Sequence, residues 1–434
     1  MARWIVIRRR LVMAAAALAA IASPLLAQVN PNQPLAPIAS LTASGSARFT
    51  PDRLVAATDL KAGQVITVTE LRQAANRRAG SGEFSKVTYS FDDSRRGTDI
   101  QFQVSDQPYL LPVAFDNFVW MPREQVIARL RSKIPLFSGE LPEHGNVDQQ
   151  VTAALQDILK QQGVSGASVN GMALEGGISA GSATSYAFFV SGVKIPVQGF
   201  LVAGVPAQLV PAMRKDLGFL LGGNYSRSQV EEVSRLRLFP ELQDRGYIRA
   251  KLDPPVARLI APGRQGVSVS LTFITGSQYR WGTVRCGGNT VFGSKQILGL
   301  VKVRSGRLAD MGKLNQGIAA IGKLYGSRGY LFATTMAHSD FSQPGVAGED
   351  LAITEGSEFY MGAVSFGGSS APLAAKLSRL WKLAPGEPYN AGYLPQYVLS
   401  LGKRFPGFAF NYSISPDKSR RTVKVTVVPW KFSR

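Results

Sequence analysis

The sequence predicts an α+β fold built from five similar modules in series, and two recurring glycine positions are the basis for this prediction. A first glycine recurs with spacings of 82, 78, 83 and 80 residues, at Gly63, Gly145, Gly223, Gly306 and Gly386. A second glycine follows each first one by roughly 20 residues, the length of one helix with its turn, at Gly82, Gly163, Gly246, Gly329 and Gly407. Two positions that stay in phase five times indicate a repeated unit.

The fourth unit shows the order of elements most clearly. A run of β-branched and aromatic residues from Tyr279 ends in a Gly-Gly-Asn turn, which predicts a strand. Ser294 can cap a short helix, a longer helix has apolar residues at helical spacing, and Gly329 ends that second helix. The helices are predicted at residues 295–300 and 313–327, and two further strands at 330–336 and 350–354. The predicted order is strand, helix, helix, strand, strand.

The same order is predicted for the other four units from the same periodicities. In the first unit the elements are 38–44, 51–57, 68–79, 86–91 and 99–104. In the second they are 115–120, 123–134, 147–161, 167–172 and 185–190. In the third they are 197–203, 207–217, 226–244, 248–252 and 267–273, with Pro240 expected to bend the longer helix. In the fifth they are 362–366, 372–383, 391–405, 408–414 and 422–428. The linkers between units are short, which predicts an elongated array.

The N-terminal residues have the layout of an export signal. Arg3 and Arg8 to Arg10 precede an apolar run over residues 11–22, which is followed by small-residue cleavage sites. The run is too short for a spanning helix, which needs about 20 apolar residues. We therefore expect residues 1–27 to be a signal peptide and the proline-rich residues 28–37 to be a flexible leader.

Composition narrows the class of protein. The formal net charge is +20, and a basic exported chain can associate with anionic lipid, lipopolysaccharide phosphates or other acidic partners. Export argues against nucleic acid as a partner. The single cysteine, Cys286, cannot form an internal disulfide, so packing must provide the stability.

The module resembles the POTRA domain. The resemblance rests on Tyr279-Arg-Trp-Gly-Thr-Val at its first strand and on Leu324-Tyr-Gly-Ser-Arg-Gly-Tyr-Leu-Phe-Ala at the end of its second helix. It implies five POTRA-like domains at residues 38–107, 108–193, 194–277, 278–356 and 357–430. Five such domains after a signal peptide are similar to the periplasmic arm of BamA-type outer-membrane assembly proteins, in which they hold barrel substrates and accessory subunits.

The resemblance also carries one departure. In that family the last POTRA domain runs into a sixteen-stranded barrel, and here only residues 430–434 follow Pro429. We therefore expect an arm without the membrane barrel. A separate barrel partner, a barrel-less paralogue and a truncated reading frame are the alternatives, and the sequence does not identify the partner or client, the angles between modules or the oligomeric state.

No enzyme is predicted. His144 and His338 are the only histidines and neither has a metal-ligand spacing to a second His or Cys. The glycine-rich turns lack the Lys-Ser/Thr pair of a phosphate loop. The expectation is therefore no catalytic residue, no metal and no cofactor.

Binding by edge strands is the predicted chemistry, because a three-stranded sheet leaves backbone groups free to pair with an extended peptide. The resemblance implies that the second strand is this edge. The candidates are residues 86–91, 167–172, 248–252, 331–336 and 408–414, and the last two are preferred. The predicted partner-binding residues are Leu331, Phe332, Ala333, Thr334, Thr335, Met336, Phe408, Ala409, Phe410, Asn411 and Tyr412. The alternative is that the Phe and Tyr side chains face their own helices and that the next module covers the edge.

Basic residues near the C-terminal end are a second candidate site. Lys403, Arg404, Lys418, Arg420 and Arg421 can contact lipid head-group phosphates, and the alternative is a solvated charged face.

These features predict a non-enzymatic scaffold or chaperone-like arm for outer-membrane protein assembly or secretion. It would lie in the periplasm, peripheral to the outer membrane of a Gram-negative bacterium. The expected partners are an outer-membrane barrel protein or its unfolded precursors and accessory assembly subunits, with peripheral membrane contact. The alternative is a structural envelope component of cell division or export that contacts a fixed protein partner without unfolded clients.

Overall fold

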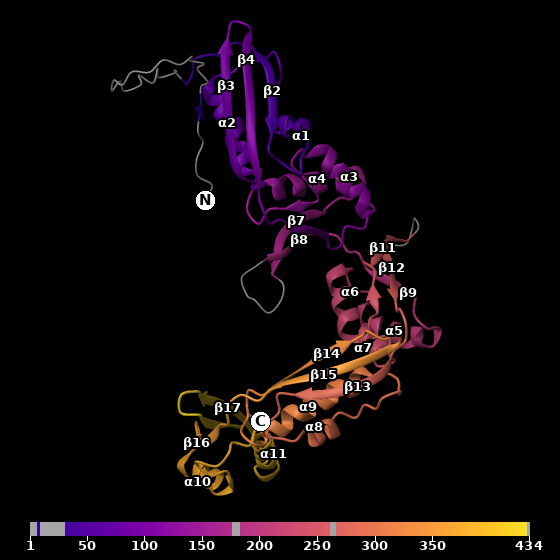
Figure 1. The fold of residues 1–434 in the computed structure, drawn as a ribbon, viewed down its shortest axis with the longest axis vertical. Coiled ribbons are helices and arrows are strands. Elements are labelled where there is room, and N and C mark those ends of the chain that lie inside the picture. The colour runs from indigo at the N-terminus through magenta and orange to yellow at the C-terminus, as the bar shows by residue number, and fades with distance from the viewer. Residues whose placement is uncertain (1–6, 9–30, 176–182, 261–265, 432–434) are drawn as a thin grey trace, which may run out of the picture. The chain divides into compact units, whose positions relative to one another are not determined.

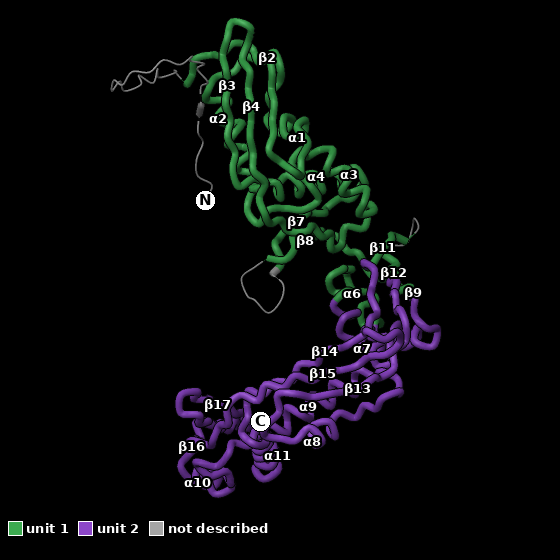
Figure 2. The backbone as a smooth tube through the Cα atoms, viewed as in Figure 1, with its two compact units in different colours: residues 1–201, 217–231, 255–270 green, residues 202–216, 232–254, 271–434 purple. Residues whose placement is uncertain are grey.

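The computed structural model describes residues 7–8, 31–175, 183–260 and 266–431. These residues form five sheets with helices beside them, which gives an α+β fold (Figure 1). The chain divides into two compact units (Figure 2), made of residues 1–201, 217–231 and 255–270 and of residues 202–216, 232–254 and 271–434. Each sheet lies in one of the five predicted segments, and the domain boundaries themselves stay predictions. Apart from Ile7–Arg8, the predicted signal peptide lies outside the described residues.

The first sheet has the order β1-β3-β4-β2. Its elements are β1 (Ile7–Arg8), β2 (Ile38–Ser44), α1 (Pro51–Ala56), α2 (Val68–Gly80), β3 (Phe84–Ser94) and β4 (Gly97–Asp106). Helix α2 begins at a capping box, in which the Glu70 N–H donates to Thr67 Oγ1 (3.2 Å) and the Thr67 N–H donates to Glu70 Oε2 (2.7 Å). Strands β3 and β4 are longer than predicted, because they form a continuous antiparallel hairpin.

The second sheet has the order β6-β5-β8-β7. Its elements are β5 (Leu111–Phe115), α3 (Arg123–Lys133), β6 (Glu140–Leu141), α4 (Val147–Gln161), β7 (Ser168–Glu175) and β8 (Ala183–Ser191). Helix α4 buries an apolar stripe that includes Val151, Leu155 and Ile158 against the aromatic rings of Phe115 and Phe188. This stripe follows the 3.6-residue period of the sequence, so local pattern alone places the helix on the sheet.

The third sheet has the order β10-β12-β11, with β9 beside β12. Its strands are β9 (Val197–Ala203), β10 (Lys251–Leu252), β11 (Val256–Leu259) and β12 (Val267–Ile274). Its helical elements are η1 (Ala207–Leu209), α5 (Val210–Leu217), η2 (Gly218–Leu220), α6 (Arg227–Val233), the π-helical turn η3 (Ser234–Leu238) and α7 (Phe239–Gln243).

Two predictions for this segment need correction or refinement. The candidate edge at 248–252 is wrong over most of its length, because only Lys251–Leu252 is a strand and the Ala250 N–H bonds back to the Tyr247 carbonyl in a turn. The helix with Pro240 continues, but it passes through the π-helical turn η3. A proline removes one helical hydrogen bond and clashes with the preceding turn, and a π turn is one way to relieve that clash.

The fourth and fifth sheets share one topology. The fourth segment contains β13 (Arg280–Gly287), α8 (Ser294–Leu300), α9 (Met311–Gly326), β14 (Thr334–Asp340) and β15 (Val346–Thr354). The fifth contains β16 (Tyr360–Phe366), α10 (Ala371–Leu380), α11 (Tyr393–Arg404), β17 (Phe408–Asp417) and β18 (Thr422–Lys431). The sheet orders are β13-β15-β14 and β16-β18-β17. In each sheet the last strand is central, parallel to the first and antiparallel to the second.

One backbone hydrogen bond recurs in four of the five segments and explains the first glycine position. In each case a glycine N–H donates to a first-strand carbonyl 25 residues earlier, in the pairs Gly63–Ile38, Gly222–Val197, Gly306–Trp281 and Gly386–Met361. These glycines have φ between 77° and 87°, a region that favours glycine. In the third segment the residue in this role is Gly222 and not the predicted Gly223.

Candidate partner-binding edges

Strand β14 lies at the edge of the fourth sheet, as the second-strand prediction requires. Its only strand neighbour in the part of the chain that the structure describes is β15. Thr334, Thr335 and Met336 belong to it, and Met336 is 64% exposed. One side of the β14 backbone is therefore available for pairing with an added strand.

The other three residues predicted for this edge do not belong to it. Leu331 and Phe332 form a turn and Ala333 precedes the strand, so the prediction is wrong for this stretch. The Leu331 N–H bonds to the Gly329 carbonyl (3.0 Å) and the Ala333 N–H to the Tyr330 carbonyl (3.3 Å). These turn bonds replace the ladder bonds of a strand, which is why β14 begins only at Thr334.

Leu331 and Phe332 instead join the fourth segment to the fifth. Leu331 packs against the core of the fifth segment, and the Phe332 ring lies edge-on to Phe359 with centroids 5.3 Å apart. The ammonium of Lys418 lies 5.3 Å from the Phe332 ring centroid, an arrangement that attracts a cation to the ring face. The alternative that the next module covers part of the predicted edge therefore applies to these two residues.

Strand β17 is the edge of the fifth sheet and pairs on one side with β18 over ten residues. Phe408, Ala409, Phe410, Asn411 and Tyr412 all lie in it. Phe410 is 8% exposed and Phe408 packs against the same core, so these rings face their own helices. Further along the strand, Tyr412 is 46% and Ile414 43% exposed. The apolar face that the alternation predicted is thus buried at its start and open at its end.

The five basic residues of the second candidate site separate into two places. Lys403 and Arg404 lie in the last turn of α11, whereas Lys418, Arg420 and Arg421 lie around the turn between β17 and β18. Of the second group, Lys418 contacts Phe332 and Arg420 Nε lies 4.0 Å from Asp417 Oδ2. The structure therefore does not bring the five together as one cluster.

The second recurring glycine has a role that the sequence did not reveal. The Tyr279 N–H donates to the Gly246 carbonyl (2.8 Å) and the Phe359 N–H donates to the Gly329 carbonyl (2.9 Å). Each glycine therefore ends a helix and also holds the first residues of the following segment. In both cases the glycine lies five residues before, and its partner five residues after, a pair of residues in antiparallel register, Lys251–Ile274 and Thr334–Thr354. This constant register is a signal that could have identified the contact.

A carboxylate fixes the start of the connection between these two segments. Glu355 accepts hydrogen bonds from the Thr290 N–H (2.8 Å), the Val291 N–H (2.9 Å) and the Tyr325 hydroxyl (2.7 Å). Burial raises the pKa of Glu355, but these hydrogen bonds outweigh it and lower the pKa to about 2. The ionised group ties the end of β15 to the loop before α8 and to the core ring of Tyr325.

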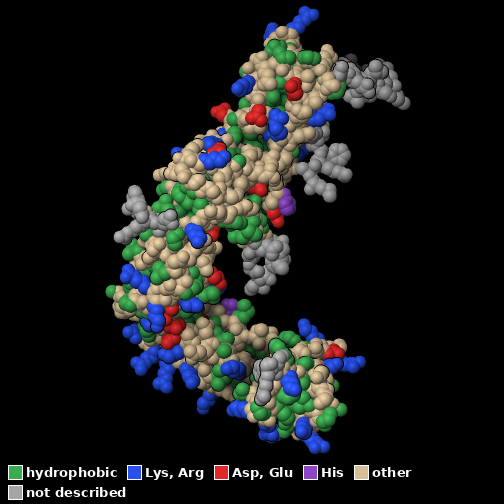
Figure 3. All heavy atoms as spheres, turned by 180° about the vertical axis from the view of Figure 1, so that it is seen from behind, with side chains coloured by type: hydrophobic (Ala, Val, Ile, Leu, Met, Phe, Trp, Pro, Cys, Tyr) green, Lys and Arg blue, Asp and Glu red, His purple; other side chains and the backbone are tan. Residues whose placement is uncertain are grey.

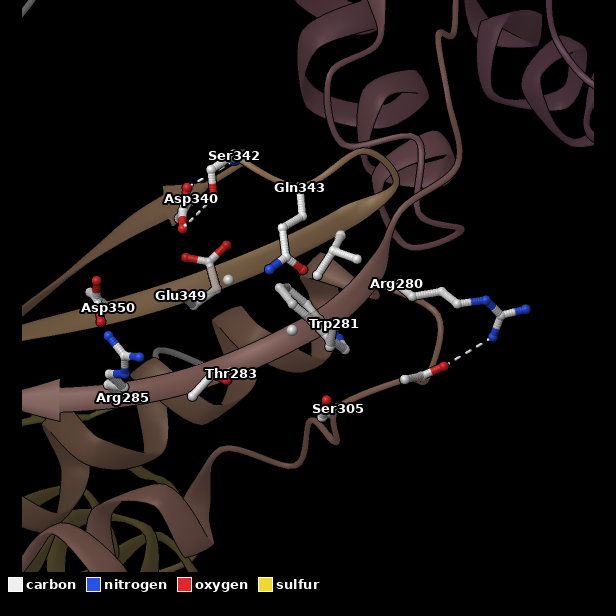
Figure 4. A pocket seen from close by; sticks show the side chains of 14 residues that line it. Arg280, Trp281, Thr283, Arg285, Ser305, Asp340, Ser342, Gln343, Glu349 and Asp350 are labelled. Atoms are coloured by element: carbon white, nitrogen blue, oxygen red, sulfur yellow. Dashed lines mark hydrogen bonds between the residues drawn. The ribbon is translucent and has the colours of Figure 1, made fainter.

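A cavity of about 460 Å³ lies beside the start of β13 and the ends of β14 and β15 (Figure 4). Arg280 extends away from the acidic side chains and donates to the Gly306 carbonyl (3.0 Å). Asp340 accepts from the N–H (2.9 Å) and hydroxyl (3.1 Å) of Ser342, and these bonds lower its pKa. Ser342 therefore donates to a carboxylate and does not face a general base.

The buried carboxylate near this cavity is Glu349, which is 1% exposed. Burial raises its pKa, against the effect of a 2.6 Å hydrogen bond from the Ser339 hydroxyl. No three His, Cys, Asp or Glu side chains within the described ranges are placed to hold a metal ion. In those same ranges no helix has both the length and the apolar composition to cross a bilayer.

One segment of the chain matches a known family model. The POTRA model, described as "Surface antigen variable number repeat", matches residues 279–354, which contain β13 to β15. Among curated proteins, a "Putative outer membrane protein assembly factor" from Treponema pallidum (strain Nichols) is 26% identical over 115 residues. The match covers 26% of this chain and 14% of that protein.

Solved structures of related title also resemble the chain. One is BamA POTRA3-5 of Haemophilus influenzae, with 18% identity, coverage of 54% of this chain and 95% of that one, and a TM-score of 0.45. Another is the N-terminal domain of Omp85 from Thermosynechococcus elongatus, with 16% identity, coverage of 56% and 100%, and a TM-score of 0.26. The resemblance to POTRA domains that the sequence indicated is confirmed: residues 279–354 are a POTRA domain, and the chain resembles the POTRA-bearing part of outer-membrane assembly proteins.

Proposed function

We propose that the chain is a non-enzymatic periplasmic arm that serves outer-membrane protein assembly or secretion by adding extended segments of other proteins to its edge strands. The observation that carries the proposal is that β14, an edge strand open on one side among the described residues, lies inside the matched POTRA domain. The name of the curated relative supports the assembly role.

Edge pairing suits a partner that must accept many sequences. Main-chain hydrogen bonds supply affinity without reading side chains, and alternate side chains along the edge adjust specificity. On β17 the exposed Tyr412 and Ile414 lie two residues apart and so share one face. On β14 the exposed Met336 offers a flexible apolar contact that adapts to different partners.

The proposal includes the absence of catalysis by this arm. Ser342 donates to Asp340 and Ser339 to Glu349, so neither hydroxyl has a base that could activate it. Ser339 and His338 are neighbours in β14 and point to opposite sides of the sheet. These residues therefore do not support a nucleophile and base pair.

Crosslinking in intact cells tests the edges. A photoreactive residue is placed at Met336 in β14 or at Tyr412 in β17, and the matched control is Ala352, which is exposed but lies in the central strand β15. The expected result is capture of several barrel precursors from the two edge positions and little capture from Ala352. Equal capture from all three positions, or no capture of envelope proteins, would contradict edge addition.

The identity of the captured proteins also separates the two functions considered. Many different barrel precursors would support the holding of clients. One stoichiometric partner would instead support a fixed envelope scaffold, because a dedicated interface selects a single sequence.

A further inference from the structure

Helices α10 and α11 present a basic surface that faces away from the fifth sheet. Leu377 on α10 and Leu401 on α11 are fully buried against the core. The exposed side chains on the outer sides of these helices and the loop between them define what we name the outer helix surface: Lys376, Arg379, Lys382, Leu399 and Lys403. Figure 3 shows Lys and Arg side chains gathered at the lower end of the view, where the C-terminal segments lie.

The charges of this surface are not neutralised locally. Between residues 371 and 407 the only carboxylate is Glu387, and its Oε2 accepts a hydrogen bond from the Ala384 N–H (3.0 Å) within its own loop. None of the surface's four cations forms an ion pair with another described residue. An unpaired group of like charges attracts a polyanionic partner.

An apolar side chain lies among these cations. Leu399 is 66% exposed in the middle of α11. The loop that carries Lys382 is held in place, because the Lys382 N–H donates to the Tyr393 hydroxyl (2.6 Å) and the Trp381 indole N–H donates to the Leu383 carbonyl (2.7 Å). The Trp381 ring also lies edge-on to Tyr393, with centroids 5.0 Å apart. The surface is therefore a fixed platform with one apolar projection.

We propose that the outer helix surface binds a bilayer that contains anionic lipids. Three of its four cations are lysines, which are depleted from protein interfaces but act as point charges toward lipid head groups. An exposed leucine within a basic helical face is the composition of an interfacial contact, in which the apolar side chain enters the head-group region. Of the five head-group residues predicted from the sequence, this surface retains Lys403 and replaces the β17–β18 turn with α10.

Vesicle binding of the full chain tests this surface locally. A polarity-sensitive fluorophore is attached after Leu399→Cys in a Cys286→Ser background, and vesicles of phosphatidylcholine with one quarter phosphatidylglycerol are compared with phosphatidylcholine alone. A blue shift is expected only with the anionic vesicles. Because each cation near the surface contributes about 1 kcal/mol, Arg379→Gln with Lys382→Gln should weaken the partition about 30-fold.

The matched control is Arg420→Gln with Arg421→Gln, which removes the same charge from the turn of the same segment. This pair should change the partition less than threefold. A missing blue shift on anionic vesicles, or equal weakening by both pairs, would overturn the proposal; the first outcome would leave a protein as the partner of this surface. The surface lies on helices and not on an edge strand, so its failure would not affect the crosslinking result.

Discussion

Replacing Gly329 by alanine should loosen the connection between the fourth and fifth segments. Gly329 has φ of 84°, and a Cβ added there would lie 2.4 Å from the Phe359 carbonyl oxygen. That oxygen accepts the Tyr389 N–H (2.8 Å), while the Phe359 N–H donates to Gly329 itself (2.9 Å). The methyl group must therefore displace a peptide unit that holds both bonds.

The magnitude follows from a comparison with Gly306. Gly306 has φ of 77° and nothing within 4 Å of an added Cβ, so Gly306→Ala reports backbone strain alone, which is about 1–2 kcal/mol. Gly329→Ala has the same strain and in addition weakens two hydrogen bonds worth about 1 kcal/mol each. We expect an excess of about 2 kcal/mol for Gly329→Ala, which is about a 30-fold difference in an opening equilibrium.

Amide hydrogen exchange read at Phe359 and Tyr389 is the appropriate assay, because a chain of several segments does not unfold in a single two-state transition. In Gly329→Ala both amides should exchange about 30-fold faster than in Gly306→Ala, as worked out from the two weakened bonds. Equal exchange in the two variants would refute the assignment of Gly329 as the contact between segments.

Three further outcomes follow from the same structure. Glu355 has its pKa lowered from 4.5 to about 2, so its contribution to stability is present above pH 4.5 and is lost as the pH falls toward 2; Glu355→Gln should remove this loss in urea unfolding at pH 3 and 6, and an unchanged pH dependence would contradict it. Glu83 is fully buried and burial, followed by the neighbouring charges of Arg48, Asp106 and Glu140, raises its pKa from 4.5 to about 8. Stability should therefore fall as the pH rises from 4.5 to 8, and Glu83→Gln should recover on the order of 3 kcal/mol at pH 8 in the same assay, whereas a loss at pH 8 would show that the carboxyl is ionised and paired. Phe332→Ala should cost about 1–2 kcal/mol through the lost Phe359 and Lys418 contacts, seen as faster exchange of the Phe359 amide, and no change there would assign Phe332 to the edge instead.

The start of β14 shows why the edge could be predicted only in part. Residues 330–336 are aromatic, apolar or β-branched throughout, so their composition predicts one strand. After Gly329, however, the chain forms a turn, and Leu331 packs against the core of the fifth segment. A contact with a different segment therefore decides where the strand begins, and composition does not report it.

Strand β17 shows the same limit in side-chain burial. Alternation correctly places Phe408, Phe410 and Tyr412 on one face, because side chains on a strand alternate. Phe410 is 8% and Tyr412 46% exposed, since the covering core extends along only part of the strand. The length of that cover depends on packing in three dimensions.

The sequence by itself determined the repeated α+β segments and their order of elements, because glycines, caps and apolar periodicity act over a few residues each. It also determined the resemblance to the POTRA domain. The tertiary structure alone decided which side of each strand is open, that Lys418 contacts Phe332, and that Gly246 and Gly329 bind the segment that follows. These features depend on contacts between residues about 30 to 90 positions apart, and their energies come from packing and hydrogen bonds that no local pattern records.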